Sequence, residues 1–419
     1  MNKLSIKTDE LYVRVCLIAI ACLVIVLSVF AAKWNFANAV STKADTKDIA
    51  DIAAWLAPDD PQTRYAAGVI YDKTFEPADA ERSLAEFEAA AANTPNNYLA
   101  WLALSKARGR NGDAEGEMAA VKRALDLAPN YAAVQWAYGN VLFRNGDERA
   151  MQYIRQAAES DKQYRVSAVD LMMLRYESNV VEVRSALGES PAILAAICQN
   201  LVRNQKFAEA MQLWSSINYE EDRIATTEQA LAMAPVVLNG KQFRFAQMLF
   251  REAGRSSGRI GSVSDGGFEG GVKARGAEAF EWQIADGSEP QIAISNSTKH
   301  DGNNSLLLQF NTMEASAFRR VSQTIAVDPG SSFTFSAYYR SELKTQTTVK
   351  FAITDAASGK VLASTEPVAA NSDWKQLTAN FTVPLDSDGI MISLLRAECS
   401  SSVCPISGRL WIDDVSLSK

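Results

Sequence analysis

Few residues in this sequence could carry out acid–base or nucleophilic chemistry. His300 is the only histidine among 419 residues, which excludes metal motifs built on paired histidines and argues against imidazole-based catalysis. Residues 254–258 read Gly-Arg-Ser-Ser-Gly and match the pattern of a serine nucleophile elbow. That chemistry needs a strand before the serine, a helix after it and a histidine base. Here a helical pattern precedes the segment and strand patterns follow it, so we interpret it as a linker.

The sequence gives equally little support for other kinds of catalytic site. The sequence contains no phosphate-binding glycine loop and no dinucleotide-binding fingerprint. A glycosidase needs only two carboxylates, but no enzymatic scaffold is apparent that would hold such a pair. We therefore expect a protein that is not an enzyme. The alternative is a carbohydrate-active enzyme or its accessory subunit.

The cysteines fall into two groups. Cys399 and Cys404 are separated by four residues in a Ser-rich loop between two strand-like runs. This spacing predicts a disulfide across a hairpin loop, which requires an oxidising compartment, whereas the alternative is two unpaired loop thiols. Cys16 and Cys22 lie in an apolar run and Cys198 in a helical pattern, where a thiol serves as a small apolar side chain.

Composition limits the size and partners of the chain. At 419 residues it is too long for one core, so two or three domains are expected. It has 42 basic and 49 acidic residues and no basic stripe. This balance argues against nucleic acid as the main partner.

One segment near the amino terminus is apolar enough to cross a membrane. Val15–Ala32 carries no charge, and its 18 residues would form about 27 Å of helix. The positive charges on its two sides are equal in number, but the short basic amino terminus and the predicted disulfide favour a chain whose bulk lies outside the cytoplasm. We expect a single-pass anchor. The alternative is a signal peptide cleaved at Ala37-Asn38-Ala39, although the apolar run is longer than a usual secretory core.

The next 200 residues show a helical repeat. Pro61, Pro95 and Pro129 stand 34 residues apart, and the tetrapeptide at 110–113 recurs at 144–147 as Arg-Asn-Gly-Asp. Such a period is typical of stacked helix-turn-helix units. The best unit, residues 98–129, resembles the tetratricopeptide repeat at Trp101, Leu104, Ser105, Ala124 and Pro129, and departs from it at Arg108 and Glu117. The resemblance implies a scaffold that binds protein partners in a groove.

After Arg251 the helical spacing gives way to alternation. Turn signals such as Asp301-Gly302 and Asp328-Pro329-Gly330 separate about ten short strands, which predict an all-β sandwich or jelly roll. The apolar positions expected on the core side are Leu306/Leu308/Phe310, Phe333/Phe335/Ala337/Tyr339, Val349/Phe351/Ile353 and Leu377/Ala379/Phe381/Val383.

The order of landmarks in residues 262–419 resembles the jelly-roll carbohydrate-binding modules grouped as families four, nine and twenty-two. The landmarks are residues 265–269 (Asp-Gly-Gly-Phe-Glu), Trp282, Trp374 and residues 411–417 (Trp-Ile-Asp-Asp-Val-Ser-Leu). The resemblance implies a structural calcium ion bound by Glu269 and by Asp414 or Asp413, because calcium prefers oxygen ligands. The alternative is that these carboxylates face water at strand ends.

The same resemblance implies sugar binding on an exposed sheet face. Alternation turns Tyr338 and Arg340 away from the core and makes Gln376 another candidate, with Trp282 as a further aromatic. Because few aromatic side chains remain free, a degenerate module that contacts protein or envelope is the alternative.

Together these patterns predict a multidomain fold: an N-terminal transmembrane helix, an all-α tetratricopeptide-like solenoid and an all-β jelly-roll sandwich. The predicted function is a membrane-anchored extracytoplasmic scaffold of bacterial cell-envelope polysaccharide assembly or export, with a sensor as a further alternative. The expected boundaries are a cytoplasmic tail at 1–12, the anchor at 13–34, the repeat domain at 44–252, a linker at 253–261 and the sandwich at 262–419.

Overall fold

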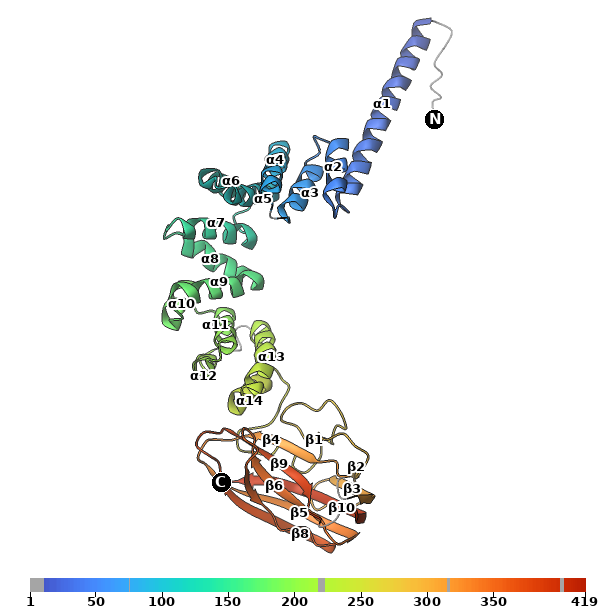
Figure 1. The fold of residues 1–419 in the computed structure, drawn as a ribbon, viewed down its shortest axis with the longest axis vertical. Helices are drawn as coiled ribbons and strands as arrows, with labels where there is room; N and C mark the ends of the chain where they lie inside the picture. The colour runs from blue at the N-terminus through green and yellow to red at the C-terminus, as the bar shows by residue number, and fades with distance from the viewer. Residues whose placement is uncertain (1–10, 75, 218–222, 315–316, 400–402) are drawn as a thin grey trace, which may run out of the picture. The chain divides into compact units, whose positions relative to one another are not determined.

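The computed structural model describes residues 11–74, 76–217, 223–314, 317–399 and 403–419. Within these ranges, fourteen helices precede ten strands, as the predicted order of α and β regions requires. The chain divides into two compact units, Met1–Gly188 and Glu189–Lys419. The first unit is helical, and the second combines four helices with the sandwich (Figure 1).

The helices of the first unit are α1 (Leu11–Ser41), α2 (Lys47–Leu56), α3 (Pro61–Asp72), α4 (Pro77–Asn93), α5 (Tyr98–Arg110), α6 (Ala114–Leu127), α7 (Ala132–Arg144), α8 (Ala150–Ser160), α9 (Lys162–Arg175) and α10 (Val180–Leu187).

Helix α1 continues well beyond the apolar run. It has 31 residues and is long and apolar enough to cross a membrane. Its last turns pack against α2 and α3, where Ala37 is fully buried and the Asn38 amide donates to the Asp60 carboxylate at 3.1 Å. The helix that could span a bilayer is therefore continuous with the first packed layer of the helical unit.

A matching hydrogen bond recurs at the start of three helices. The side chains of Arg64, Trp101 and Gln135 each donate to the carbonyl oxygen of a proline six residues earlier, at 2.7, 3.0 and 2.8 Å. The accepting prolines are Pro58, Pro95 and Pro129. The structural counterpart in the first unit of the repeat is thus Pro58 rather than Pro61, which instead begins α3 as its first residue.

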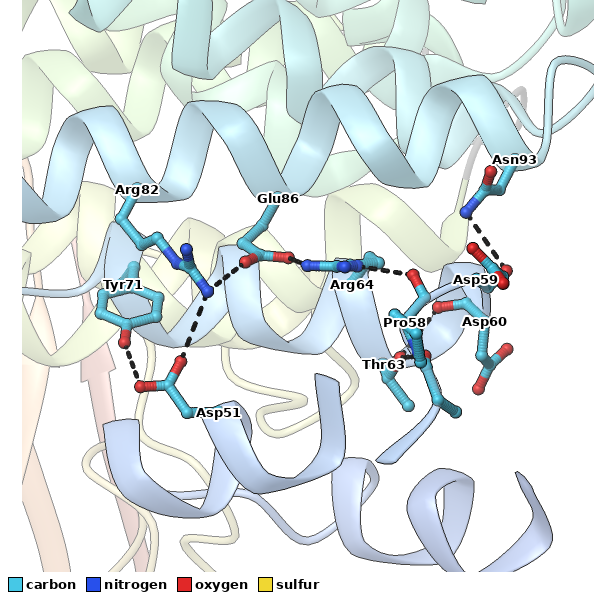
Figure 2. Close-up of polar contacts among 11 residues, drawn as sticks. Asp51, Pro58, Asp59, Asp60, Thr63, Arg64, Tyr71, Arg82, Glu86 and Asn93 are labelled. Atoms are coloured by element: carbon cyan, nitrogen blue, oxygen red, sulfur yellow. Dashed lines mark hydrogen bonds and ion pairs between the residues drawn. The ribbon is translucent and has the colours of Figure 1, made fainter. Parts of the chain in front are cut away.

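The first helices are also joined by a buried ionic network (Figure 2). The Glu86 carboxylate is 1% exposed and lies 2.8 Å from a guanidinium nitrogen of both Arg64 and Arg82. Arg82 also approaches Asp51 at 3.8 Å, and the Tyr71 hydroxyl donates to Asp51 at 2.7 Å. A buried carboxylate is costly without partners. Arg64 of α3 supplies one and so joins α3 to α4, whereas Arg82 lies in α4 itself and links that helix to Asp51 of α2.

The second unit begins with α11 (Pro191–Arg203), α12 (Phe207–Trp214), α13 (Arg223–Asn239) and α14 (Phe243–Glu252). The first turn of α14 is capped from the sandwich: the Asp388 carboxylate accepts from the backbone N–H groups of Phe243 (2.9 Å) and Arg244 (3.1 Å). Gly389 leaves no room for a Cβ atom beside the Phe243 ring. These contacts attach α14 directly to the sandwich.

The predicted linker, residues 253–261, is held by contacts to the sandwich. Arg255 pairs with Glu278 at 3.3 Å, and the Gly261 N–H donates to the Ala326 carbonyl at 2.8 Å. This segment therefore lies within the second unit and is tied to the sandwich at both ends.

The sandwich consists of two five-stranded antiparallel sheets. One, the β4 sheet, has the order β1-β4-β9-β6-β7, and the other, the β5 sheet, has the order β2-β3-β10-β5-β8. The strands are β1 (Gln283–Ile284), β2 (Gln291–Ser295), β3 (Ser305–Glu314), β4 (Val321–Ala326), β5 (Ser332–Thr345), β6 (Val349–Asp355), β7 (Val361–Ser364), β8 (Asn371–Thr382), β9 (Gly389–Arg396) and β10 (Val403–Ser418).

The predicted alternation is confirmed by burial. Phe333, Phe335, Ala337 and Tyr339 of β5 are at most 3% exposed, and the predicted positions on β3, β6 and β8 join them in one core between the sheets. Alternate β5 residues therefore line the outer face of the β5 sheet. Cys399, in the connection from β9 to β10, and Cys404, the second residue of β10, form a disulfide with a Cα–Cα distance of 6.3 Å.

Candidate functional site

Three predicted sugar-binding residues lie on the outer face of the β5 sheet. Tyr338 on β5 is directly paired with Gln376 on β8, and Arg340 follows Tyr338 on the same side of β5. All three are exposed or half-buried. The structure therefore brings together Tyr338, Arg340 and Gln376, as alternation predicts.

The Tyr338 ring is covered on one side by the single histidine. The His300 ring stacks on it with centroids 3.8 Å apart and planes at 15°, and its edge meets Trp374 at 5.5 Å. The His300 Nδ1 atom lies 2.5 Å from the Asp414 carboxylate. A sugar ring would have to use the other side of Tyr338 or displace His300, so stacking on Tyr338 stays a prediction.

Four charged residues of this face interact with one another. Arg409 contacts Glu342 at 2.7 Å, and Arg340 lies 3.9 Å from Glu342 and 3.8 Å from Asp373. Both guanidinium groups also approach the Trp411 ring, at 5.1 and 5.9 Å, and that residue is only 4% exposed. Trp411 therefore offers little ring surface to a ligand.

Trp282 requires a correction. Its side chain is 4% exposed and belongs to the sandwich core, where it packs against Phe268 with a centroid distance of 5.3 Å. The indole N–H donates to the Asp265 carbonyl at 3.1 Å. Because a buried indole needs such an acceptor, Trp282 serves the core and does not present its ring to a sugar.

The carboxylates of the predicted calcium site hold a loop. Glu269 accepts from the backbone N–H groups of Asn303 (2.6 Å) and Asn304 (3.1 Å), and Asp413 accepts from those of His300 (2.8 Å) and Asp301 (3.4 Å). Together with the bond from His300 to Asp414, these contacts fasten residues 300–301 to β10 and residues 303–304 to Glu269.

The pKa values of the two carboxyl groups that hold this loop are shifted in opposite directions. The N–H donors from Asn303 and Asn304 lower the pKa of Glu269. Burial raises the pKa of Asp413, which is fully buried, although three backbone N–H groups oppose this effect. Among the described residues no three carboxylate, imidazole or thiol side chains gather around a common point. Calcium binding by Glu269, Asp413 and Asp414 therefore stays a prediction, and it would have to share carboxylate oxygens that accept backbone N–H groups here.

A recess of about 660 Å³ lies at the edge of the other sheet. It is lined by the loop at 273–277, by residues 283–286 in and after β1, and by Arg320 and Ser322 at the start of β4. The volume falls within the range of small-molecule sites, about 300–1,000 Å³. The lining residues include no aromatic side chain.

The recess contains more positive than negative side chains. Lys273 is paired with Glu281 at 2.7 Å, whereas Arg275, Arg320 and Asp286 are exposed and line the recess. Within the part of the chain that the structure describes, neither arginine forms an ion pair or a side-chain hydrogen bond.

Sequence reasoning did not identify this recess. Residues 270–282 show neither helical nor strand periodicity, so nothing in the sequence places them over β1 and β4. The available signal was the pair Arg319 and Arg320 directly before a strand, of which Arg320 lines the recess.

A family model decides what kind of module this is. Residues 261–394 match the model described as a carbohydrate binding domain, of the type that joins families 4 and 9. This segment is a carbohydrate-binding module. The match supports glycan binding by the sandwich. No curated protein matches the chain.

Solved structures similar to this chain include other modules of the kind. A structure described as a xylan-binding domain from family 22 has 18% identity and a TM-score of 0.26, covering 38% of this chain and 94% of its own. A family 4 module has 18% identity and a TM-score of 0.28, covering 37% and 98%. The enzymatically active domain of tailspike protein 4 of bacteriophage CBA120 has 19% identity and a TM-score of 0.29, and the match spans 38% of this chain but only 21% of the tailspike. At these scores the likenesses add no argument beyond the family match.

Proposed function

We propose that this protein is a non-catalytic, membrane-anchored extracytoplasmic scaffold, in which the carbohydrate-binding module holds a polysaccharide in the recess beside β1 and β4. The observation that carries this proposal is the recess itself, a site-sized hollow in a module of a carbohydrate-binding family. Its lining of guanidinium, amide and hydroxyl groups suits the hydroxyl-rich surface of a sugar.

The anchor is supported by the packing of α1. Ala37 is fully buried, and Asn38 is bonded to Asp60 inside a continuous helix. A peptidase that cleaves Ala37-Asn38-Ala39 would have to unfold this packed turn. We therefore infer a single-pass anchor that is retained, and the disulfide between Cys399 and Cys404 favours an oxidising compartment outside the cytoplasm.

The helical pairs, which we infer to be tetratricopeptide-like, would bind protein partners. Repeats of this kind stack because a single unit cannot bury its own apolar face, and the stack leaves an extended surface. An anchored chain that carries both a glycan-binding module and such a surface suits a role in bacterial cell-envelope polysaccharide assembly or export.

The test is to measure binding of the full-length protein, in detergent or nanodiscs, to a panel of neutral and acidic polysaccharides. Ala274 is exposed and lines the recess, so Ala274→Trp should fill it and weaken binding by about tenfold or more. Leu385→Trp, at an 86% exposed position outside the recess lining, is the matched control. Unchanged binding by Ala274→Trp, or no binding to any polysaccharide, would contradict the proposal.

A further inference from the structure

The charges that line the recess indicate which class of sugar it would bind. The chain has a net charge of −7, yet the recess is lined by Lys273, Arg275 and Arg320 against a single carboxylate, that of Asp286. Glu281 neutralises Lys273. Two guanidinium groups and one carboxylate therefore remain, which leaves the recess positive on an acidic protein.

The two arginines differ from those on the β5 sheet. Arg340 and Arg409 share the Glu342 carboxylate and lie over Trp411. Arg275 and Arg320 form no comparable ion pair with any described residue. A guanidinium group presents a planar set of donors that matches a carboxylate with two parallel hydrogen bonds. A planar carboxylate is therefore the anion that best suits these two guanidinium groups.

The lack of an aromatic lining points the same way. Neutral glycans gain much of their affinity from stacking a sugar ring on an aromatic side chain, and none lines this recess. Charge-assisted hydrogen bonds are the remaining strong interaction available there. We infer that the module binds an acidic polysaccharide, with a uronate carboxylate held between Arg275 and Arg320.

This inference rests on the proposed function and is tested separately from it. The full-length protein would be titrated with polygalacturonate and alginate, with the methyl esters of both, and with dextran sulfate. We expect binding to the two uronates to weaken about tenfold or more on esterification, which removes the charge but keeps the chain of sugars. Arg275→Gln and Arg320→Gln should each weaken uronate binding by a similar factor.

Arg259→Gln is the matched control, because Arg259 is exposed, lies in the same module and does not line the recess. It should bind as the unchanged protein does. Equal binding of acids and esters would overturn the acidic-sugar inference and leave the proposed function standing. Binding of dextran sulfate but not of the uronates would overturn the carboxylate assignment, and no binding to any glycan would overturn both.

A second inference rests on different residues and on the proposed anchor. The Lys33 ammonium lies 5.4 Å from the centre of the Trp55 ring, and Lys33 directly follows the apolar run. Helix α2 buries Ala50, Ala53 and Ala54 and leaves Ile52 and Trp55 exposed, at 52% and 74%. The exposed tryptophan therefore lies beside the end of the membrane-crossing segment.

The place of Trp55 next to Lys33 indicates what surrounds the exposed side chains of Ile52 and Trp55. If α1 spans the bilayer to Ala32, the contact with Lys33 places Trp55 among the lipid headgroups, where tryptophan is enriched. Asp48, on the same side of α2, lies seven residues earlier and about 10 Å farther along the helix axis, and thus in water. We propose that Ile52 and Trp55 insert into the outer interface of the bilayer.

The test uses the full-length protein in nanodiscs whose lipids carry bromine near the headgroup, which quenches nearby tryptophan fluorescence. Trp55→Phe should reduce the quenched fraction, whereas Trp136→Phe, in the helical unit but remote in sequence from the anchor, should not. An unchanged quenched fraction in Trp55→Phe, with the protein still in the nanodisc, would overturn this inference. Failure to enter the nanodisc would overturn the anchor as well.

Discussion

The two outer faces of the carbohydrate-binding module differ in how their polar side chains are used. On the β5 sheet, Arg340 and Arg409 are paired with carboxylates, and the His300 ring covers Tyr338. At the edge of the β4 sheet, Arg275 and Arg320 line a recess without such partners. On the first face, the polar side chains named here are therefore engaged with other parts of the protein, whereas the two arginines of the recess have no ion-pair partner among the described residues.

The difference shows that residue type alone does not locate a binding site. A tyrosine and an arginine on alternating strand positions suit a sugar, but their contacts decide whether they are free to bind one. The following predictions test this comparison.

The largest effect is expected at Trp282. Trp282→Ala would leave a large cavity beside Phe268 and an unpaired Asp265 carbonyl, and should destabilise the sandwich by about 3–5 kcal/mol. Denaturant unfolding of the full-length protein, followed in the transition of the sandwich, measures this loss. Tyr338→Ala is the matched control, and its cost should be much smaller because the ring lies outside the core. If Trp282→Ala kept normal stability but lost glycan binding, Trp282 would belong to the binding site and not to the core.

The prediction for Trp282 also shows where sequence reasoning succeeds. Alternation identified the core side of β5 because neighbouring residues in a strand point to opposite faces, and Phe333, Phe335 and Tyr339 are buried as expected. Trp282 lies just before the two-residue strand β1, where no period exists to assign it to a face.

Contacts between residues that are far apart in the chain could not be predicted from the sequence. The pairing of His300 with Tyr338 and Asp414 joins positions that are 38 and 114 residues apart. The recess likewise depends on how the loop at 273–277 crosses β1 and β4, which is set by tertiary packing. A local pattern contains neither arrangement.

The next effect concerns the cover on the β5 sheet. His300→Ala removes the ring from Tyr338 and the contact with Asp414, and should cost about 1 kcal/mol of stability. Uronate binding should not change, since the recess is unaffected. Calorimetric titration with polygalacturonate would check this. A marked gain in affinity for neutral glycans would mean that Tyr338 becomes a platform once it is uncovered, and that the two faces differ only by this one side chain.

A smaller effect is expected from acid. The folded-state pKa of Glu269 is lowered from 4.5 by the N–H groups of Asn303 and Asn304. A lowered carboxyl pKa contributes stability above the unfolded value, and this contribution is lost as the pH falls through the folded value. The melting temperature of the sandwich should therefore decline below about pH 4.5, and Glu269→Gln should reduce that decline.

Asp413 acts in the opposite direction, which gives an internal control. Its pKa is raised by burial, so its contribution is present below the unfolded value of 3.8 and is lost as the pH rises through the folded value. The difference between Glu269→Gln and the unchanged protein isolates Glu269. If both proteins melt in parallel from pH 6 to pH 3, the loop at 300–304 does not depend on this carboxylate.

The smallest effect is expected from calcium. The oxygens of Glu269 and Asp413 accept N–H groups from residues 300, 301, 303 and 304, so the end of β10 is held without an ion that needs six to eight oxygen ligands. A ligand that binds only the folded state at 100 times its Kd adds about 2.7 kcal/mol of stability, which shifts a melting temperature by several degrees. Adding a chelator, or calcium in the millimolar range, should leave the melting temperature of the sandwich unchanged. A rise of several degrees with calcium, lost in Glu269→Gln and kept in Tyr338→Ala, would show that the loop opens to admit the ion. The site implied by the family resemblance would then apply to this chain.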